Sequence, residues 1–155
     1  AKLRDEGFGA QEIAERTRAM TGRVQTSFIL DTLQYMHKGG RCTGVAALGA
    51  NLLNLKPCIE VKDGSMEVGK KYRGKLESVL EQYTEARLKG KEHLDLDQIL
   101  IAHCYVDQSL LDRVIQKIKE CQPFRDIVVL DTGCSVSVHC GPNTLGLIYM
   151  TDGTE

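Results

Sequence analysis

The sequence predicts an α/β fold: a two-layer domain with a mixed β-sheet of about five or six strands and helices packed over one face. Residues 98–131 read as strand, helix and strand, and such a connection is a right-handed crossover that sets its two strands parallel. Residues 58–72 read as a β-hairpin, which adds antiparallel strands. Parallel and antiparallel pairs in one chain, alternating with helical segments, indicate a mixed sheet with helices on it.

Length and charge narrow the classes of protein. With 155 residues, of which 42% are hydrophobic, the chain can build one domain with a real core. Its 20 basic and 21 acidic residues give a net charge of −1, which argues against a nucleic-acid partner. The longest uncharged run, 42–55, is too short and too polar to span a bilayer, and no signal peptide is visible. Residues 1–7 read as the end of a helix, so we expect a fragment of a longer chain.

The first part of the chain is expected to alternate helices with one strand. The expected elements are helices at 10–20, 33–38 and 45–53, the last buried on most sides, and a strand at 25–30. Asp31 and Thr32 can cap the second helix. Gly39 suits the left-handed position that ends it, and Gly40 allows the backbone to turn sharply and approach another group.

The second part continues with strands and amphipathic helices. Asp63 and Gly64 give the turn of the hairpin, and an apolar stripe predicts a helix at 76–88. The polar segment 89–97 is expected to be a surface connection. After it we expect a strand at 98–104 covered on both faces, a helix ending before Pro123, a buried strand at 126–131 and a last strand at 145–150.

A histidine near the C-terminus is predicted to lie on a turn. In His139-Cys140-Gly141-Pro142-Asn143, the glycine tolerates φ > 0, the proline fixes φ near about −65°, and the asparagine suits a left-handed conformation. A histidine held there can present both ring nitrogens to an anionic head group such as a carboxylate or phosphate. The alternative is a histidine that caps the turn by bonding its own backbone.

Two arginines stand beside glycines. Arg41 follows Gly39 and Gly40, and Arg73 precedes Gly74. Each is either an ordinary solvated charge or an anion-binding group whose geometry the neighbouring glycines set.

The cysteines and histidines are candidates for a metal or catalytic site. The six cysteines are scattered, and without a secretory signal we expect free, mostly buried thiols: Cys42, Cys58, Cys104, Cys121, Cys134 and Cys140. A zinc site built from His103, Cys104, Cys134, His139 and Cys140 is disfavoured, because neither a C-x-x-C nor an H-x-x-x-H pair is present. We therefore predict neither a metal nor a cofactor.

Three segments occur in an order and spacing that resemble a known family. They are Asp31-Thr32-Leu33-x-x-Met36-x-x-Gly39-Gly40-Arg41 after a strand, the hairpin from Lys56-Pro57 to Lys62-Asp63-Gly64, and His139-Cys140-Gly141-Pro142. The set resembles the C-terminal lobe of the DegV family of bacterial fatty-acid-binding proteins, over nearly the whole chain. The family's last motif reads H-x-G-P-G, and here Asn143 replaces the final glycine. The resemblance makes 1–155 a DegV-like C-terminal domain, with 1–24 as lead-in helices from the junction with an N-terminal lobe.

The resemblance implies a cytoplasmic, non-enzymatic carrier. It would sequester one long-chain fatty acid and present the carboxylate to a fatty acid kinase, which makes acyl-phosphate for phospholipid synthesis. By this analogy His139 would contact the carboxylate, and Arg41 and Arg73 would serve the head group or the kinase. The bound fatty acid would be the ligand, with no stable membrane insertion and transient membrane contact left open. The supporting turns would be formed by Gly39, Gly40, Gly141 and Pro142.

Two other interpretations remain at this point. In a protein-interaction domain without a lipid ligand, Arg41, Arg73 and His139 would form a surface patch. In an enzyme, Cys140 or Cys104 would be a nucleophile with a histidine base, but adjacent His-Cys neighbours diverge on a strand. Retained lipid would separate the carrier from the interaction domain.

Overall fold

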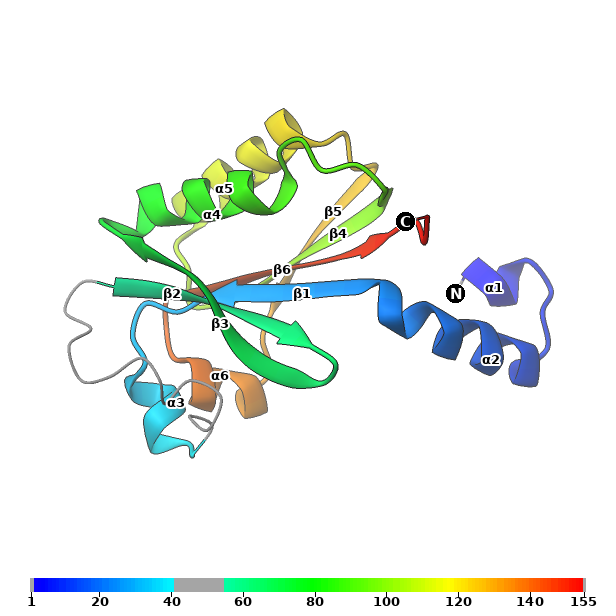
Figure 1. Ribbon diagram of the computed structural model, residues 1–155, viewed down its shortest axis with the longest axis horizontal. Coiled ribbons are helices and arrows are strands. Elements are labelled where there is room, and N and C mark those ends of the chain that lie inside the picture. Colours follow the sequence, from blue (N-terminus) through cyan, green and yellow to red (C-terminus); the bar gives the residue numbers. More distant parts are fainter. Residues whose placement is uncertain (1, 41–54, 155) are drawn as a thin grey trace.

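The computed structural model describes residues 2–40 and 55–154 as a mixed sheet with helices on it (Figure 1). The helices are α1 (Lys2–Asp5), α2 (Ala10–Met20), the 3-10 helix η1 (Thr21–Arg23), α3 (Gln34–Lys38), α4 (Leu76–Leu88), α5 (Gln108–Cys121) and α6 (Cys134–Cys140). The strands are β1 (Val24–Ile29), β2 (Leu55–Lys62), β3 (Ser65–Arg73), β4 (Leu94–Cys104), β5 (Asp126–Asp131) and β6 (Thr144–Thr151).

The six strands form one sheet in the order β3-β2-β1-β6-β4-β5. Only β4 and β5 run parallel, joined through α5, and the other neighbouring pairs are antiparallel. The β2–β3 hairpin turns at Asp63 and Gly64, whose φ values are 50° and 75°, as an aspartate-glycine hairpin turn requires. The predicted α/β class, mixed sheet and crossover are confirmed.

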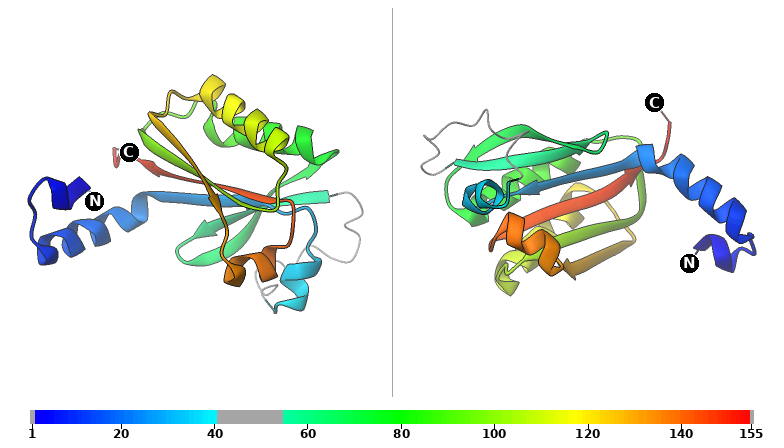
Figure 2. Two further views of the ribbon diagram at one scale, coloured as in Figure 1. Left: turned by 180° about the vertical axis from the view of Figure 1, so that it is seen from behind. Right: turned by 90° about the horizontal axis from the view of Figure 1, so that it is seen from below.

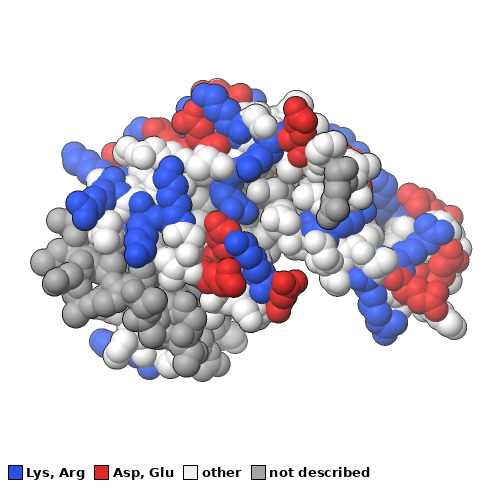
Figure 3. Space-filling model, in the orientation of Figure 1, with Lys and Arg blue, Asp and Glu red and all other residues white. Residues whose placement is uncertain are grey.

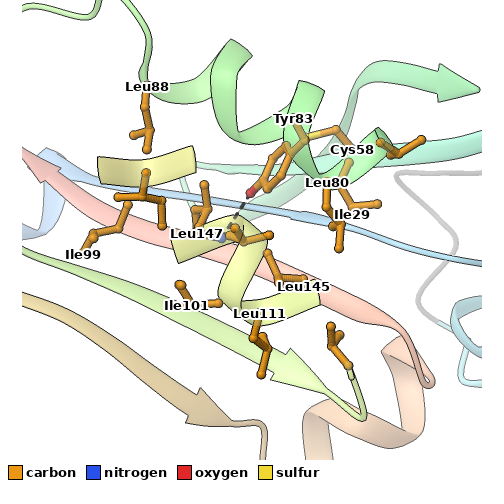
Figure 4. Close-up of a cluster of buried hydrophobic side chains, with 14 of the residues drawn as sticks. Ile29, Cys58, Leu80, Tyr83, Leu88, Ile99, Ile101, Leu111, Leu145 and Leu147 are labelled. Atoms are coloured by element: carbon orange, nitrogen blue, oxygen red, sulfur yellow. Dashed lines mark hydrogen bonds between the residues drawn. The ribbon is translucent and has the colours of Figure 1, made fainter. Parts of the chain in front are cut away.

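The main core lies between the sheet and the helices α4 and α5 (Figure 4). Leu80 and Tyr83 of α4 pack on side chains from the central strands, among them Ile99 and Leu147. The buried Tyr83 hydroxyl donates a hydrogen bond to the Ser27 carbonyl at 2.8 Å and accepts one from the Leu147 amide at 3.1 Å. This hydroxyl therefore fixes α4 over the junction of β1 and β6, and a buried polar group of this kind needs its partners.

A second, smaller core lies on the opposite side of the sheet. There α3 and α6 pack at one end of the strands (Figure 2), over a cluster that includes Leu30, Met36, Ile59 and Cys140. The expectation of helices over one face holds for α4 and α5 but is wrong for this pair. Helices lie on the second face as well because Leu30 and Ile59 offer apolar surface there, which two short helices can cover.

The first helices form an arm that extends beyond the sheet (Figure 1). None of the residues of α2 is buried, and η1 connects it directly to β1. An ion pair between Lys2 and Asp97, 2.7 Å apart, ties the start of the arm to the sheet. The helix predicted at 10–20 is α2, with the same bounds.

Two strands differ from their sequence prediction. β4 begins at Leu94, so much of the expected surface connection is strand; its alternating Leu94 and Leu96 pack against the main core. β5 is an edge strand of the sheet, and its side chains Val129 and Leu130 are exposed rather than buried. The predicted helix at 45–53 lies outside the described residues. None of the described helices is long and apolar enough to span a membrane.

Candidate functional site

His139 lies in the last turn of α6, so its predicted position on a turn is wrong. The helix forms although serines and valines are moderate helix formers, because its end is fixed by one tertiary contact and by a closing hydrogen bond. Cys140 is buried in the second core, and the Gly141 amide donates to the Ser137 carbonyl at 2.8 Å. Gly141 then ends the helix with φ 77°, and Asn143 has φ 60°, the left-handed conformation expected for it.

The His139 ring lies against the backbone of Gly39, at the end of α3. A Cβ atom added to Gly39 would stand 2.0 Å from His139 Nδ1. This nitrogen is shielded from solvent and has no hydrogen-bond partner among the described residues. His139 itself is half-buried, and the absence of a side chain at Gly39 leaves the space that its ring occupies.

A second glycine contact joins the same two helices. A Cβ atom added to Gly141 would stand 2.2 Å from the ring atom Cδ2 of Tyr35. Tyr35 belongs to α3 and Gly141 follows α6, whereas Gly39 follows α3 and His139 belongs to α6. Each helix therefore places an aromatic ring over the glycine that ends the other.

The roles of the two glycines after α3 differ from the prediction. Gly39 has φ −79°, and Gly40 is the residue with the left-handed φ of 68°. Gly40 thus makes the turn that was predicted for Gly39. Gly39 provides the close approach that was predicted for Gly40, since the His139 ring leaves no room for a side chain there.

A polar cluster beside the site was missed in the sequence. Asp31, two residues after β1, forms an ion pair with Lys56 of β2. Its second oxygen accepts a hydrogen bond of 3.5 Å from the Asn143 amide group. Of the two residues predicted to cap α3, Thr32 accepts a hydrogen bond from the Gln34 amide at 3.3 Å, whereas the residue at the N-cap position, Leu33, makes no side-chain cap. Asp31 therefore joins two strand ends to the turn after α6. The one sequence signal for this role is the position of Asp31 directly after a predicted strand.

The arginines are placed differently from His139. Arg73 is the last residue of β3 and is exposed, where the chain turns toward α4 and away from α6 (Figure 1). Figure 3 shows Lys and Arg side chains together over the end of β3 and the start of α4. The exposed cations of this stretch are Lys70, Lys71, Arg73 and Lys75. Arg41 lies outside the described residues.

The described cysteines are all free, as the sequence predicts. Burial, and then the neighbouring Cys104, raise the pKa of the Cys140 thiol, which disfavours the thiolate that a nucleophile needs. His103 lies 3.4 Å from Asp131 through Nε2. In residues 2–40 and 55–154, no cluster of three or more His, Cys, Asp or Glu side chains could hold a metal ion.

Comparisons with known proteins identify a family. A protein-family profile described as "Uncharacterised protein, DegV family" matches residues 1–152. A DegV domain-containing protein of Clostridium acetobutylicum is 29% identical over 154 residues, which cover 98% of this chain and 52% of that protein. The chain thus spans about half the length of the curated relatives that it matches.

Solved structures share the fold. A DegV family protein from Ruminococcus gnavus, refined with vaccenic acid, superimposes with a TM-score of 0.81 at 22% identity, over 95% of this chain and 52% of that one. The Fatty Acid Kinase (Fak) B3 protein of Streptococcus pneumoniae, loaded with linoleic acid, gives a TM-score of 0.77 at 21% identity, over 97% of this chain and 53% of that one. Because the family profile covers almost the whole chain, this protein belongs to the DegV family.

Proposed function

We propose that this chain is the C-terminal lobe of a fatty-acid carrier, with residues 1–24 leading in from an N-terminal lobe. The carrier holds one long-chain fatty acid and presents its carboxylate to a fatty acid kinase in the cytoplasm. The observation that carries the proposal is the half-buried His139 ring, whose position beside α3 is held by its close contact with Gly39. Family membership and the fatty acids in the similar structures support the same ligand.

Each named residue has a role in this proposal. His139 contacts the carboxylate, and Gly39 and Gly141 set the packing of the two helices that hold it. Gly40 and Pro142 support the turns next to them. Arg73, exposed and apart from α6, serves the kinase contact, and Arg41 serves the head group or the kinase.

A carrier fits the energetics of the ligand. Burying about a dozen methylene groups contributes on the order of 10 kcal/mol, at about 0.8 kcal/mol each. Apolar contacts then supply most of the affinity, and a few polar groups orient the head group. No chemical step is required of the protein, which agrees with the raised pKa of Cys140.

The test is native mass spectrometry of the full-length protein purified from a bacterial host, followed by lipid extraction. We expect a retained mass of one long-chain fatty acid, and His139→Ala should lower retention. His93→Ala is the matched control, because His93 bonds Thr154 at 2.7 Å near the C-terminus. A protein that stays empty after oleate and palmitate are added contradicts the proposal.

A protein-interaction domain without lipid is the second candidate. It is favoured by the exposed cations around Arg73, which have no ion-pair partner within the part of the chain that the structure describes. The two candidates differ in the same experiment, because an interaction domain purifies empty whether or not His139 is replaced.

A further inference from the structure

The exposed apolar side chains gather at one end of the molecule. Seven large hydrophobic residues are exposed within the described ranges. Three of them, Tyr35, Tyr105 and Val138, line one hollow of about 650 Å³. Three more, Val129, Leu130 and Val136, lie within two residues of a residue that lines it. Scattered exposed apolar residues are ordinary, but a concentration around a hollow marks an interaction site.

Tyr105 is the most prominent member of this group. Its exposed fraction is 82%, and its φ of 49° lies in the left-handed region, which large side chains rarely adopt. The fold therefore holds a mostly exposed aromatic ring on a strained backbone. Such a local cost is typical of a residue kept for a contact with another molecule.

The charge of the hollow is also specific. Among the described residues, its lining contains the Asp131 carboxylate, whose side chain is 91% exposed, and no lysine or arginine. His103, which also lines the hollow and is 9% exposed, lies 3.4 Å from this carboxylate. A matching surface has an apolar side chain to fill the hollow and a basic group to meet Asp131.

The hollow and the proposed head-group site share one helix. Val138 and Ser137 of α6 line the hollow, and the next residue is His139. A protein that reaches a carboxylate held at His139 must approach α6. We propose that the hollow around Tyr105 and Val138 is the surface on which the fatty acid kinase docks, inserting an apolar side chain beside a basic residue that pairs with Asp131. This inference rests on the proposed function.

The test measures the Kd of purified fatty acid kinase for the full-length, lipid-loaded protein. Val138→Lys should weaken binding about tenfold or more, because it removes an apolar contact and repels a basic partner. Tyr105→Asn should weaken it as well, and asparagine tolerates the left-handed backbone better than tyrosine does. The matched control is Val24→Lys. Val24 is the one exposed hydrophobic residue of the seven that lies away from the hollow, at the start of β1.

Lipid retention by each variant separates this inference from the proposed function. An empty wild-type protein contradicts the proposed carrier. A loaded wild-type protein whose Val138→Lys and Tyr105→Asn variants bind the kinase within twofold of wild type overturns the docking surface. The docking surface is also overturned if Val138→Lys only abolishes self-association in sedimentation, because a second copy then covers the hollow. It is overturned likewise if Val138→Lys releases the lipid, because another part of the same protein then covers the hollow.

Discussion

The imidazole of His139 occupies the space above Gly39 that a side chain would fill, with Nδ1 2.0 Å from the position of an added Cβ atom. The φ of Gly39, −79°, is one that any residue adopts. The glycine is therefore required by its neighbour and not by its own backbone. A substitution at Gly39 can therefore change the position of the His139 ring without straining the backbone of the turn.

Gly39→Ala should displace the His139 ring without unfolding the protein. The ring end of a side chain can move, and alanine is favoured over glycine in a helical backbone. If the ring orients the fatty acid carboxylate, its affinity should fall about tenfold, as expected for the loss of a hydrogen bond to a charged group. Fatty acid titration and urea unfolding of the full-length protein check both parts.

The adjacent Gly40→Ala is the control for this change. Gly40 has φ 68°, and nothing lies within 4 Å of an added Cβ atom. The substitution should cost about 1 to 2 kcal/mol of stability through backbone strain, with the affinity for fatty acid unchanged. If both variants lose the same affinity, the contact with His139 has no positioning role.

Gly141→Ala combines two costs. Its φ is 77°, and the added Cβ atom would stand 2.2 Å from the Tyr35 ring. We expect a loss of about 2 to 3 kcal/mol in the free energy of unfolding, from backbone strain together with the displaced ring. A double-mutant cycle with Tyr35→Ala isolates the contact: the double variant should recover the ring component and keep the strain. Additive losses would contradict a direct clash.

The elements that the sequence predicts best are those set by local signals. The helix expected at 76–88 is α4 with the same bounds, and Asp63-Gly64 turns the hairpin. Their determinants, an apolar stripe and a residue pair that accepts positive φ, lie within a few residues of one another. Such features can be recognised in any short stretch of sequence that contains them.

The candidate site depends on contacts between distant residues. Asp31 and Lys56 are 25 positions apart, and Gly39 meets His139 across most of the chain. The helix α6 was missed because serine and valine are moderate helix formers, and its burial at Cys140 appears only once the sheet is formed. The exposed face of β5 could not be predicted either, because an edge strand can be as apolar as a buried one and its place at the edge depends on the whole sheet.

The buried thiol of Cys58 should make the protein less stable in alkali. Burial raises its pKa from 9.0 to about 11, partly opposed by Arg87. The native state then holds a proton that the unfolded state releases, so the contribution to stability is present below pH 9 and is lost as the pH rises through 11. The full loss is about 2 to 3 kcal/mol, because each pKa unit is worth about 1.4 kcal/mol.

Unfolding in urea at pH 8 to 10 checks this prediction. Cys58→Ala should lower stability at pH 8 through the cavity it creates but flatten the decline between pH 9 and 10. Cys134→Ala, at an exposed position, should keep the decline. Above pH 10 Tyr72 adds to the effect, because burial raises its pKa to about 12. An unchanged slope in Cys58→Ala would assign the alkaline loss to other groups.

The ion pair of Asp31 and Lys56 should stabilise the strand ends beside the site. The Lys56 side chain is only 14% exposed, so Asp31→Asn leaves a mostly buried ammonium without its counter-ion. We expect a loss of about 1 to 2 kcal/mol, below the 3 to 5 kcal/mol of a fully buried pair because Asp31 keeps contact with water. Asp97→Asn is the control: this carboxylate pairs with Lys2 and Arg125 at the surface, where solvent screens both interactions, and the loss of stability should be much smaller. Asp31→Asn/Lys56→Met, which removes both charges, should recover part of the stability, because an apolar side chain tolerates the burial that an unpaired ammonium does not. Equal losses in Asp31→Asn and in the double variant would mean that the bond to Asn143, and not the ion pair, carries the contribution of Asp31.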